Sequence, residues 1–308
     1  MAGESKLAIY GALGANIGIA TIKFVAAGVT GSSAMISEGI HSAVDSGNSL
    51  LLLLGISRSK RPADAGHPFG HGKEIYFWTL IVAVLVFSLG GGMSLYEGIT
   101  HLQHPVELKD PKWNYVVLLV SMAFEGASLI YAVKTFNKTK GEFSFWKEVR
   151  LSKDPALFAV IYEESAALLG LLLALAGVFL CHYFENPVFD AIASMLIGLL
   201  LIIVAVVMVI ESKGLLVGES AHVDIVKGVY TLINSEPAVS TLYYPLTMHL
   251  APQEILLAID VQFKTEMTMD ELFENINHLE EKIKQEYPSI KKIYIEAKNL
   301  KGRKIPIL

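Results

Sequence analysis

Long apolar segments separated by short polar connections fill the first two thirds of the chain. Six of these segments come near the ~20 residues that an α-helix needs to cross the hydrocarbon core of a bilayer. They lie near 7–29, 34–56, 76–100, 113–134, 155–183 and 187–211. The pattern predicts an α-helical membrane protein with six transmembrane helices.

From about Gly218 onward the pattern changes to that of a soluble domain. Short runs of alternating apolar and polar residues predict strands near 240–249, 255–263 and 290–296. Amphipathic periodicity predicts helices near 220–234 and 267–288. The order helix, strand, strand, helix, strand indicates a small two-layer α+β domain.

Basic residues mark alternate connections between the predicted spans. The connections after the second and fourth spans carry Arg58, Lys60, Arg61, Lys73, Lys134, Lys138, Lys140, Lys147, Arg150 and Lys153. The opposite side carries only Lys109 and Lys112. Because cytoplasmic loops are enriched in Lys and Arg, both termini are expected in the cytoplasm. The chain then divides into a transmembrane domain at 1–212 and a cytoplasmic α+β domain at 213–308.

Composition agrees with a membrane protein and excludes several classes of site. The chain is 53% hydrophobic and 18% charged, against roughly 25% charged residues in a typical soluble domain. Cys181 is the only cysteine, so neither an internal disulfide nor a metal cage of thiolates is expected. The net charge of −5 gives no excess of basic residues of the kind that binds nucleic acid, so a nucleic-acid-binding protein is not expected. The N-terminal sequence lacks the features of a signal peptide, and with the short cytoplasmic loops this favours a bacterial inner membrane.

Four polar residues interrupt the second predicted span. Glu38, His41, Asp45 and Asn48 are spaced by three, four and three, which places them on one stripe of a helix. A His and an Asp four residues apart can present a nitrogen and an oxygen to one ion, an arrangement that suits Zn²⁺, Mn²⁺, Fe²⁺ or Co²⁺. Asn48 is a possible additional ligand. The alternative is a hydrogen-bonded network between helices that binds no metal.

Further acidic residues lie in the fourth and fifth spans. Glu163 and Glu164 are adjacent in the fifth, and because neighbours on a helix differ by about 100°, only one is expected to face the same site. The alternative places both at the cytoplasmic interface, in contact with water. Glu125 in the fourth span is a candidate for packing or for proton handling.

The connection after the second span holds a second candidate metal site. Asp64, His67 and His71 can converge on one ion, since the two histidines are one turn apart if the segment forms a helix. The alternative is a solvated loop whose histidines have no ligand role.

These motifs together resemble the cation diffusion facilitator family, which contains zinc transporters. The sequence HSAVD at 41–45 is followed, at the family's spacing, by DAGHPFGHGK at 64–73. The sequence around these motifs is most similar to the branch that includes animal zinc transporter nine and its bacterial relatives. The resemblance covers essentially the whole chain. It implies six spans, a cytoplasmic dimerisation domain of metallochaperone-like αββαβ fold, a homodimer, and export of a divalent metal ion.

The resemblance also implies roles for individual residues. The transport site of the family falls on His41 and Asp45 in the second span and on Glu164 in the fifth, where Val160 stands in place of the expected His. Water, Asn48 or Glu163 would complete the metal coordination. The loop site of the family maps onto Asp64, His67 and His71. The metal site of the family's cytoplasmic domain transfers poorly, leaving His249 and Glu296 as candidates, so metal sensing there is expected to be weak or absent.

The expected function is exchange of Zn²⁺ for protons by alternating access, with Mn²⁺, Fe²⁺ or Co²⁺ as other possible substrates. Metal binding displaces protons from His and carboxylate ligands, and protonation releases the metal. Glu163 and Glu125 are candidates for proton handling. One alternative is an intramembrane metal-dependent hydrolase, for which the sequence has no H-E-x-x-H motif. The other is a channel or non-transporting membrane receptor whose polar stripe only packs.

Overall fold

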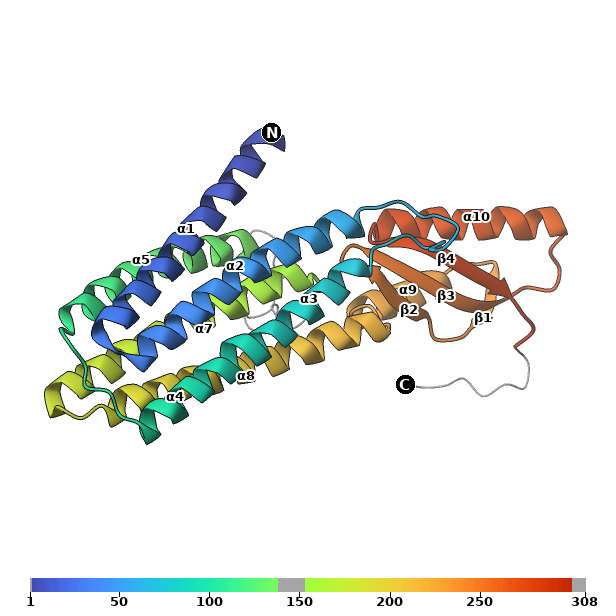
Figure 1. Ribbon diagram of the computed structural model, residues 1–308. Helices are drawn as coiled ribbons and strands as arrows, with labels where there is room; N and C mark the ends of the chain where they lie inside the picture. Colours follow the sequence, from blue (N-terminus) through green and yellow to red (C-terminus); the bar gives the residue numbers. More distant parts are fainter. Residues whose placement is uncertain (1, 138–152, 301–308) are drawn as a thin grey trace. The chain divides into compact units, whose positions relative to one another are not determined.

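The computed structural model describes residues 2–137 and 153–300, and its contacts divide the chain into two compact units (Figure 1). The first unit comprises Met1–Ser57 and Ile75–Lys213, and the second comprises Arg58–Glu74 and Gly214–Leu308. The connection after the second predicted span therefore groups with the C-terminal part of the chain. The basic residues Lys138, Lys140, Lys147 and Arg150 lie outside the described residues.

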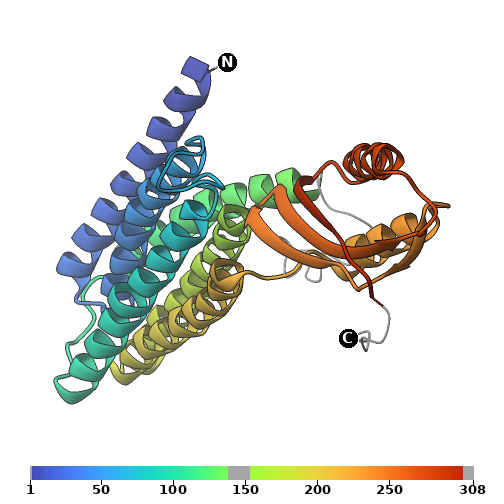
Figure 2. The ribbon, with the colours of Figure 1, turned by 90° about the vertical axis from the view of Figure 1, so that its right-hand side faces the viewer.

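The first unit is a bundle of long helices that run side by side (Figure 2). They are α1 (Ala2–Thr30), α2 (Ser33–Ser59), α3 (Glu74–Leu85), the π-helix η1 (Val86–Gly92), α4 (Met93–Gln103), α5 (Lys112–Asn137), α7 (Pro155–Phe184) and α8 (Val188–Val217). Four continuous helical segments of the described residues are long and apolar enough to span a membrane: Glu74–Gln103, Lys112–Lys134, Phe158–Phe184 and Val188–Val217. Asn16–Thr30 is a shorter apolar helix.

Glycines let the helical segment Glu74–Gln103 and α8 approach each other closely. A Cβ on Gly198 of α8 would lie 2.8 Å from the carbonyl oxygen of Gly91, and one on Gly98 would lie 2.8 Å from that of Ala191. Real Cβ atoms do not approach backbone oxygens so closely, so a larger residue at either position would separate the helices. Small residues serve this purpose in helix packing within membranes, where dispersion contacts replace the hydrophobic effect.

Asp190 near the start of α8 caps the N-terminus of α2. Its carboxylate accepts hydrogen bonds from the hydroxyl of Ser32 at 2.6 Å and from that of Ser33 at 2.9 Å. It also accepts from the backbone N–H groups of Ser33 and Ala34. The first turn of a helix has unpaired N–H groups and a partial positive charge, and a carboxylate satisfies both. This buried cap therefore fixes the end of the helix that carries the polar stripe.

The second unit contains a small sheet with two helices. Its elements are α9 (Val223–Asn234), β1 (Val239–Leu242), β2 (Leu246–Ala251), β3 (Glu254–Phe263), α10 (Met269–Glu286) and β4 (Ile290–Ala297). β1 and β2 both pair antiparallel with β3, at successive positions along it, and β4 pairs with β3 in parallel. The predicted strand at 240–249 is therefore interrupted, and Pro245 lies in the break, where its missing N–H cannot join the ladder. The predicted order of helices and strands is otherwise the observed one.

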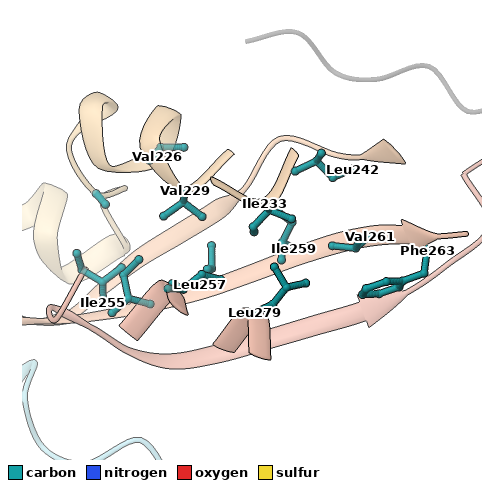
Figure 3. Packing of buried hydrophobic residues seen from close by; sticks show 13 residues of the cluster. Val226, Val229, Ile233, Leu242, Ile255, Leu257, Ile259, Val261, Phe263 and Leu279 are labelled. Carbon is teal, nitrogen blue, oxygen red and sulfur yellow. The ribbon is translucent and has the colours of Figure 1, made fainter. Parts of the chain in front are cut away.

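The core of this unit forms on one face of β3. Burial alternates along the strand, and the buried side chains are Ile255, Leu257, Ile259, Val261 and Phe263. They pack with Val226, Val229 and Ile233 of α9 and with Leu279 of α10 (Figure 3). Alternation with a period of two, which predicted the strand, arises because successive side chains point to opposite faces.

Replacing Asp190 tests the cap on α2. Asp190→Ala is expected to destabilise the protein by about 2–4 kcal/mol, because it leaves several buried donors without an acceptor. Asp190→Asn retains one carbonyl oxygen and should lose less. Thermal unfolding in detergent measures both variants. An Asp190→Ala variant with the wild-type midpoint would contradict the proposed importance of this cap.

Candidate metal centres

The polar stripe of α2 is directed into the helical unit. His41 is 2% exposed and Asp45 is 19% exposed, and the His41 Nδ1 atom lies 3.4 Å from Asp45 Oδ2. One turn further along, the Asn48 amide donates a hydrogen bond of 2.8 Å to Glu163 Oε1 on α7. The spacing of four between His41 and Asp45 thus brings the imidazole and the carboxylate side by side, as the helical periodicity predicts.

A cavity of about 50 Å³ lies beside this stripe. Among the described residues, its lining includes four carboxyl side chains from three helices: Asp45 of α2, Glu125 of α5, and Glu163 and Glu164 of α7. A cavity needs roughly 10–15 Å³ to admit one water, so this space is large enough for an ion with a few waters. Ser42 and Ser49 of α2 also line it.

Glu163 and Glu164 both line the cavity, so the expectation that only one of them faces this region is wrong. Glu163 is directed toward α2 through Asn48, whereas Glu164 Oε1 accepts a hydrogen bond of 2.6 Å from Ser128 of α5. The cavity lies between α1, α2, α5 and α7, and it is wide enough to be lined by two residues that leave α7 about 100° apart.

Several buried polar atoms around the cavity have no hydrogen-bond partner within the described residues. They are both ring nitrogens of His41, Asp45 Oδ1, Asn48 Oδ1 and Glu164 Oε2. The 3.4 Å contact between His41 and Asp45 is close enough for electrostatic attraction but lacks hydrogen-bond geometry. Buried acceptors without donors are costly, and a cation or protons would satisfy them.

The ligand atoms around the cavity do not converge on one point. Within the described residues, the only group of three or more His, Cys, Asp or Glu side chains whose ligand atoms all lie within 4.8 Å of one another is Asp64, His67 and His71. The structure brings Asp45, Glu163 and Glu164 around one space and places His41 beside Asp45. Their roles as metal ligands stay predictions.

The loop triad in the second unit is compact. Asp64 Oδ2 lies 2.9 Å from His71 Nε2, and Asp64 Oδ1 lies 3.3 Å from His67 Nδ1. The Asp64 carboxylate also accepts hydrogen bonds from the backbone N–H groups of Gly66 and His67, which close a tight turn. The hydrogen bond with His71, followed by those with the turn, holds the pKa of Asp64 well below its usual range. The carboxylate therefore stays ionised and available to a cation.

The segment after the triad lies against β2 of the same unit. A Cβ on Gly72 would be 2.6 Å from the carbonyl oxygen of Leu250, so only glycine permits this contact. Lys73 donates a hydrogen bond of 3.3 Å to the carbonyl oxygen of Leu216. A cavity of about 300 Å³ next to the triad is lined by His67 and His71 and, from β2, by Met248 and Leu250. The loop is thus held in place by contacts directly after its second histidine.

His249 and Glu296, the candidates in the second unit, join no such group among the described residues. His249 is buried on β2, and its Nδ1 lies 3.4 Å from the carbonyl oxygen of Ala251. Glu296 on β4 is largely exposed and forms an ion pair of 2.6 Å with Lys298. A metal-binding role for these two residues is untested and stays a prediction.

Sequence reasoning did not find Lys23. This residue of α1 is fully buried, and its Nζ lies 2.9 Å from Glu38 Oε2 on α2. A signal was present, because an ionisable residue within an apolar span is rare and usually has a partner or a function. Asp190 was also missed, and no periodicity marks it, since its partners lie at the start of a distant helix.

Known proteins share extensive sequence similarity with this chain. The family model for the cation efflux transmembrane domain matches residues 9–217. The proton-coupled zinc antiporter SLC30A9, mitochondrial, is 35% identical in Xenopus laevis and 34% in Homo sapiens, over 76% and 78% of this chain. Metal tolerance protein C4 of Arabidopsis thaliana is 29% identical over 86% of this chain and 59% of its own length. The chain spans 42% and 43% of the length of the two antiporters.

The relatives confirm one expectation and leave another without support. Similarity to the zinc transporter nine branch is confirmed, because the SLC30A9 antiporters match over most of the chain. A bacterial inner membrane is not supported, since these relatives are named as mitochondrial. The match to the family model covers more than half of the chain and includes the helices that surround the cavity. The chain therefore belongs to the cation efflux family of membrane transporters, the cation diffusion facilitators.

Proposed function

We propose that this protein exports a divalent metal ion, with Zn²⁺ as the preferred substrate, in exchange for protons. The observation that carries the proposal is the cavity lined by four carboxyl groups inside the helical unit of a cation efflux protein. The zinc specificity and the proton coupling are supported by the similarity to antiporters whose names state both. Mn²⁺, Fe²⁺ and Co²⁺ suit the same ligands and are the alternative substrates.

The transport site comprises His41, Asp45 and Glu164, and Asn48 or Glu163 completes the coordination. Several acidic groups in a space of low dielectric repel one another and favour uptake of cations. A divalent ion and protons compete for the same nitrogen and oxygen atoms, so binding one releases the other. If the cavity opens alternately to the two sides of the membrane, a proton gradient drives metal export. Glu125 and Glu163 carry protons to and from the site.

We propose that α1 and α2 are the first two of six transmembrane helices. At a rise of about 1.5 Å per residue, the 27-residue α2 is about 40 Å long, enough to cross the bilayer. The polar stripe lowers the mean hydropathy of α2, which explains why α2 is not one of the four apolar segments long enough to span a membrane. Both termini are then cytoplasmic, residues 1–212 form the membrane domain, and residues 213–308 form a cytoplasmic domain through which two copies dimerise.

Asp45→Ala is expected to lower Zn²⁺-driven proton flux in proteoliposomes by at least about tenfold, because it removes a carboxylate on which the metal depends. Ser49→Ala changes another residue of the cavity wall without altering charge and is the matched control. Wild-type flux in Asp45→Ala would refute the site. Absence of Zn²⁺ flux in the wild-type protein itself would favour a receptor whose polar stripe only packs, while proteolysis without metal flux would favour the hydrolase.

Glu164→Gln should reduce flux nearly as much as Asp45→Ala, whereas Glu163→Gln should be milder. Glu164 Oε2 has no hydrogen-bond partner among the described residues, while Glu163 is already bound by Asn48. Parallel initial-rate measurements of Zn²⁺ uptake compare the two variants. The reverse ranking would assign the ligand role to Glu163.

His71→Ala should reduce the number of Zn²⁺ ions bound per chain by one, because the loop triad loses the ligand that lies 2.9 Å from Asp64. Calorimetric titration of the purified protein measures this stoichiometry. His278→Ala replaces a histidine on α10 outside any candidate site and is the control. An unchanged stoichiometry in His71→Ala would show that the loop does not bind metal.

A further inference from the structure

We propose that the balance of charge between Lys23 and Glu38 controls the affinity of the acidic cavity for divalent cations, an inference that rests on the proposed transport site. In this arrangement Glu38 offsets the positive charge of Lys23, which would otherwise repel the metal ion. Lys23 in turn prevents Glu38 from adding a further free anion near the site. The pair therefore holds metal affinity between the tighter binding expected without Lys23 and the weaker binding expected without Glu38.

The pair adjoins the cavity through Ser42. Lys23 Nζ lies 2.9 Å from Glu38 Oε2 and donates a hydrogen bond of 2.8 Å to Ser42 Oγ. Ser42 lines the cavity together with Asp45. Lys23 is the only buried Lys or Arg within the part of the chain that the structure describes. The buried ammonium group of Lys23 is thus hydrogen-bonded to a residue that lines the acidic cavity.

Glu38 is confined on its other side by α7. Its Oε1 atom has no hydrogen-bond partner within the described residues and lies 2.6 Å from the position that a Cβ on Gly170 would occupy. The absence of a side chain at Gly170 gives the carboxylate its space. Glu38 and Lys23 are both 0% exposed, so water does not screen the pair.

Electrostatics gives the two members of the pair opposite effects on metal affinity. Coulomb interactions in a protein interior extend over many ångströms, and a divalent ion doubles their energy. Loss of Lys23 leaves an extra negative charge one helical turn from His41 and strengthens cation binding. Loss of Glu38 leaves an unpaired positive charge and weakens it. A pair that only holds α1 against α2 would give losses of binding in both cases.

The test is a Zn²⁺ titration at pH 8 of full-length protein carrying His71→Ala, with a chromophoric chelator as competitor. Lys23→Met is expected to bind Zn²⁺ about tenfold more tightly or better, and Glu38→Gln about tenfold more weakly or worse. The double variant, Lys23→Met with Glu38→Gln, has no net charge change and should stay within about threefold of the parent. Lys23→Arg, which keeps the charge, is the matched control.

Lys23→Gln provides a second neutral variant, because its amide can still donate hydrogen bonds to Glu38 and Ser42 and so preserves packing. Tighter binding in Lys23→Gln supports the proposal if Lys23→Met does not fold. Weaker or unchanged binding in the neutral Lys23 variants overturns it, provided that the parent binds Zn²⁺ in a manner lost on Asp45→Ala. If the parent shows no Asp45-dependent binding, the proposed transport site itself fails, and the inference falls with it.

Discussion

Burial of several carboxyl groups in one small space is the constraint on which the rest of the helical unit depends. Asp45, Glu125, Glu163 and Glu164 share a cavity of about 50 Å³, where their charges cannot all persist without cations. Protons and divalent ions are the two kinds of cation that small acidic sites accept. This burial is the observation that supports the proposed exchange of metal ions for protons.

The surrounding structure keeps this costly arrangement in place. Asp190 anchors the first turn of α2, and close contacts at Gly98 and Gly198 hold the segment Glu74–Gln103 against α8. The Lys23–Glu38 pair joins α1 to α2 beside the cavity. Each of these interactions lies in the membrane domain that the cation efflux model matches. They position the polar stripe without themselves lining the cavity.

Local periodicity made much of the architecture readable from the sequence. The alternation in β3 and the spacing of Glu38, His41, Asp45 and Asn48 depend only on neighbours along one element, so they predicted which side chains share a face. The loop triad followed from three residues within eight positions. The break before β2 was missed, although Pro245 is a local signal for it.

Contacts between distant elements could not be read in this way. The partner of Lys23, the cap from Asp190 and the joint exposure of Glu163 and Glu164 to one cavity depend on how far apart the helices stand. No spacing within a single segment encodes that distance.

Anomalous diffraction at the zinc edge, from crystals of the full chain grown with Zn²⁺, tests the central claim most directly. The account predicts an ion within about 2.0–2.2 Å of His41, Asp45 and Glu164. Zinc bound at the loop triad with none in the membrane cavity would contradict it.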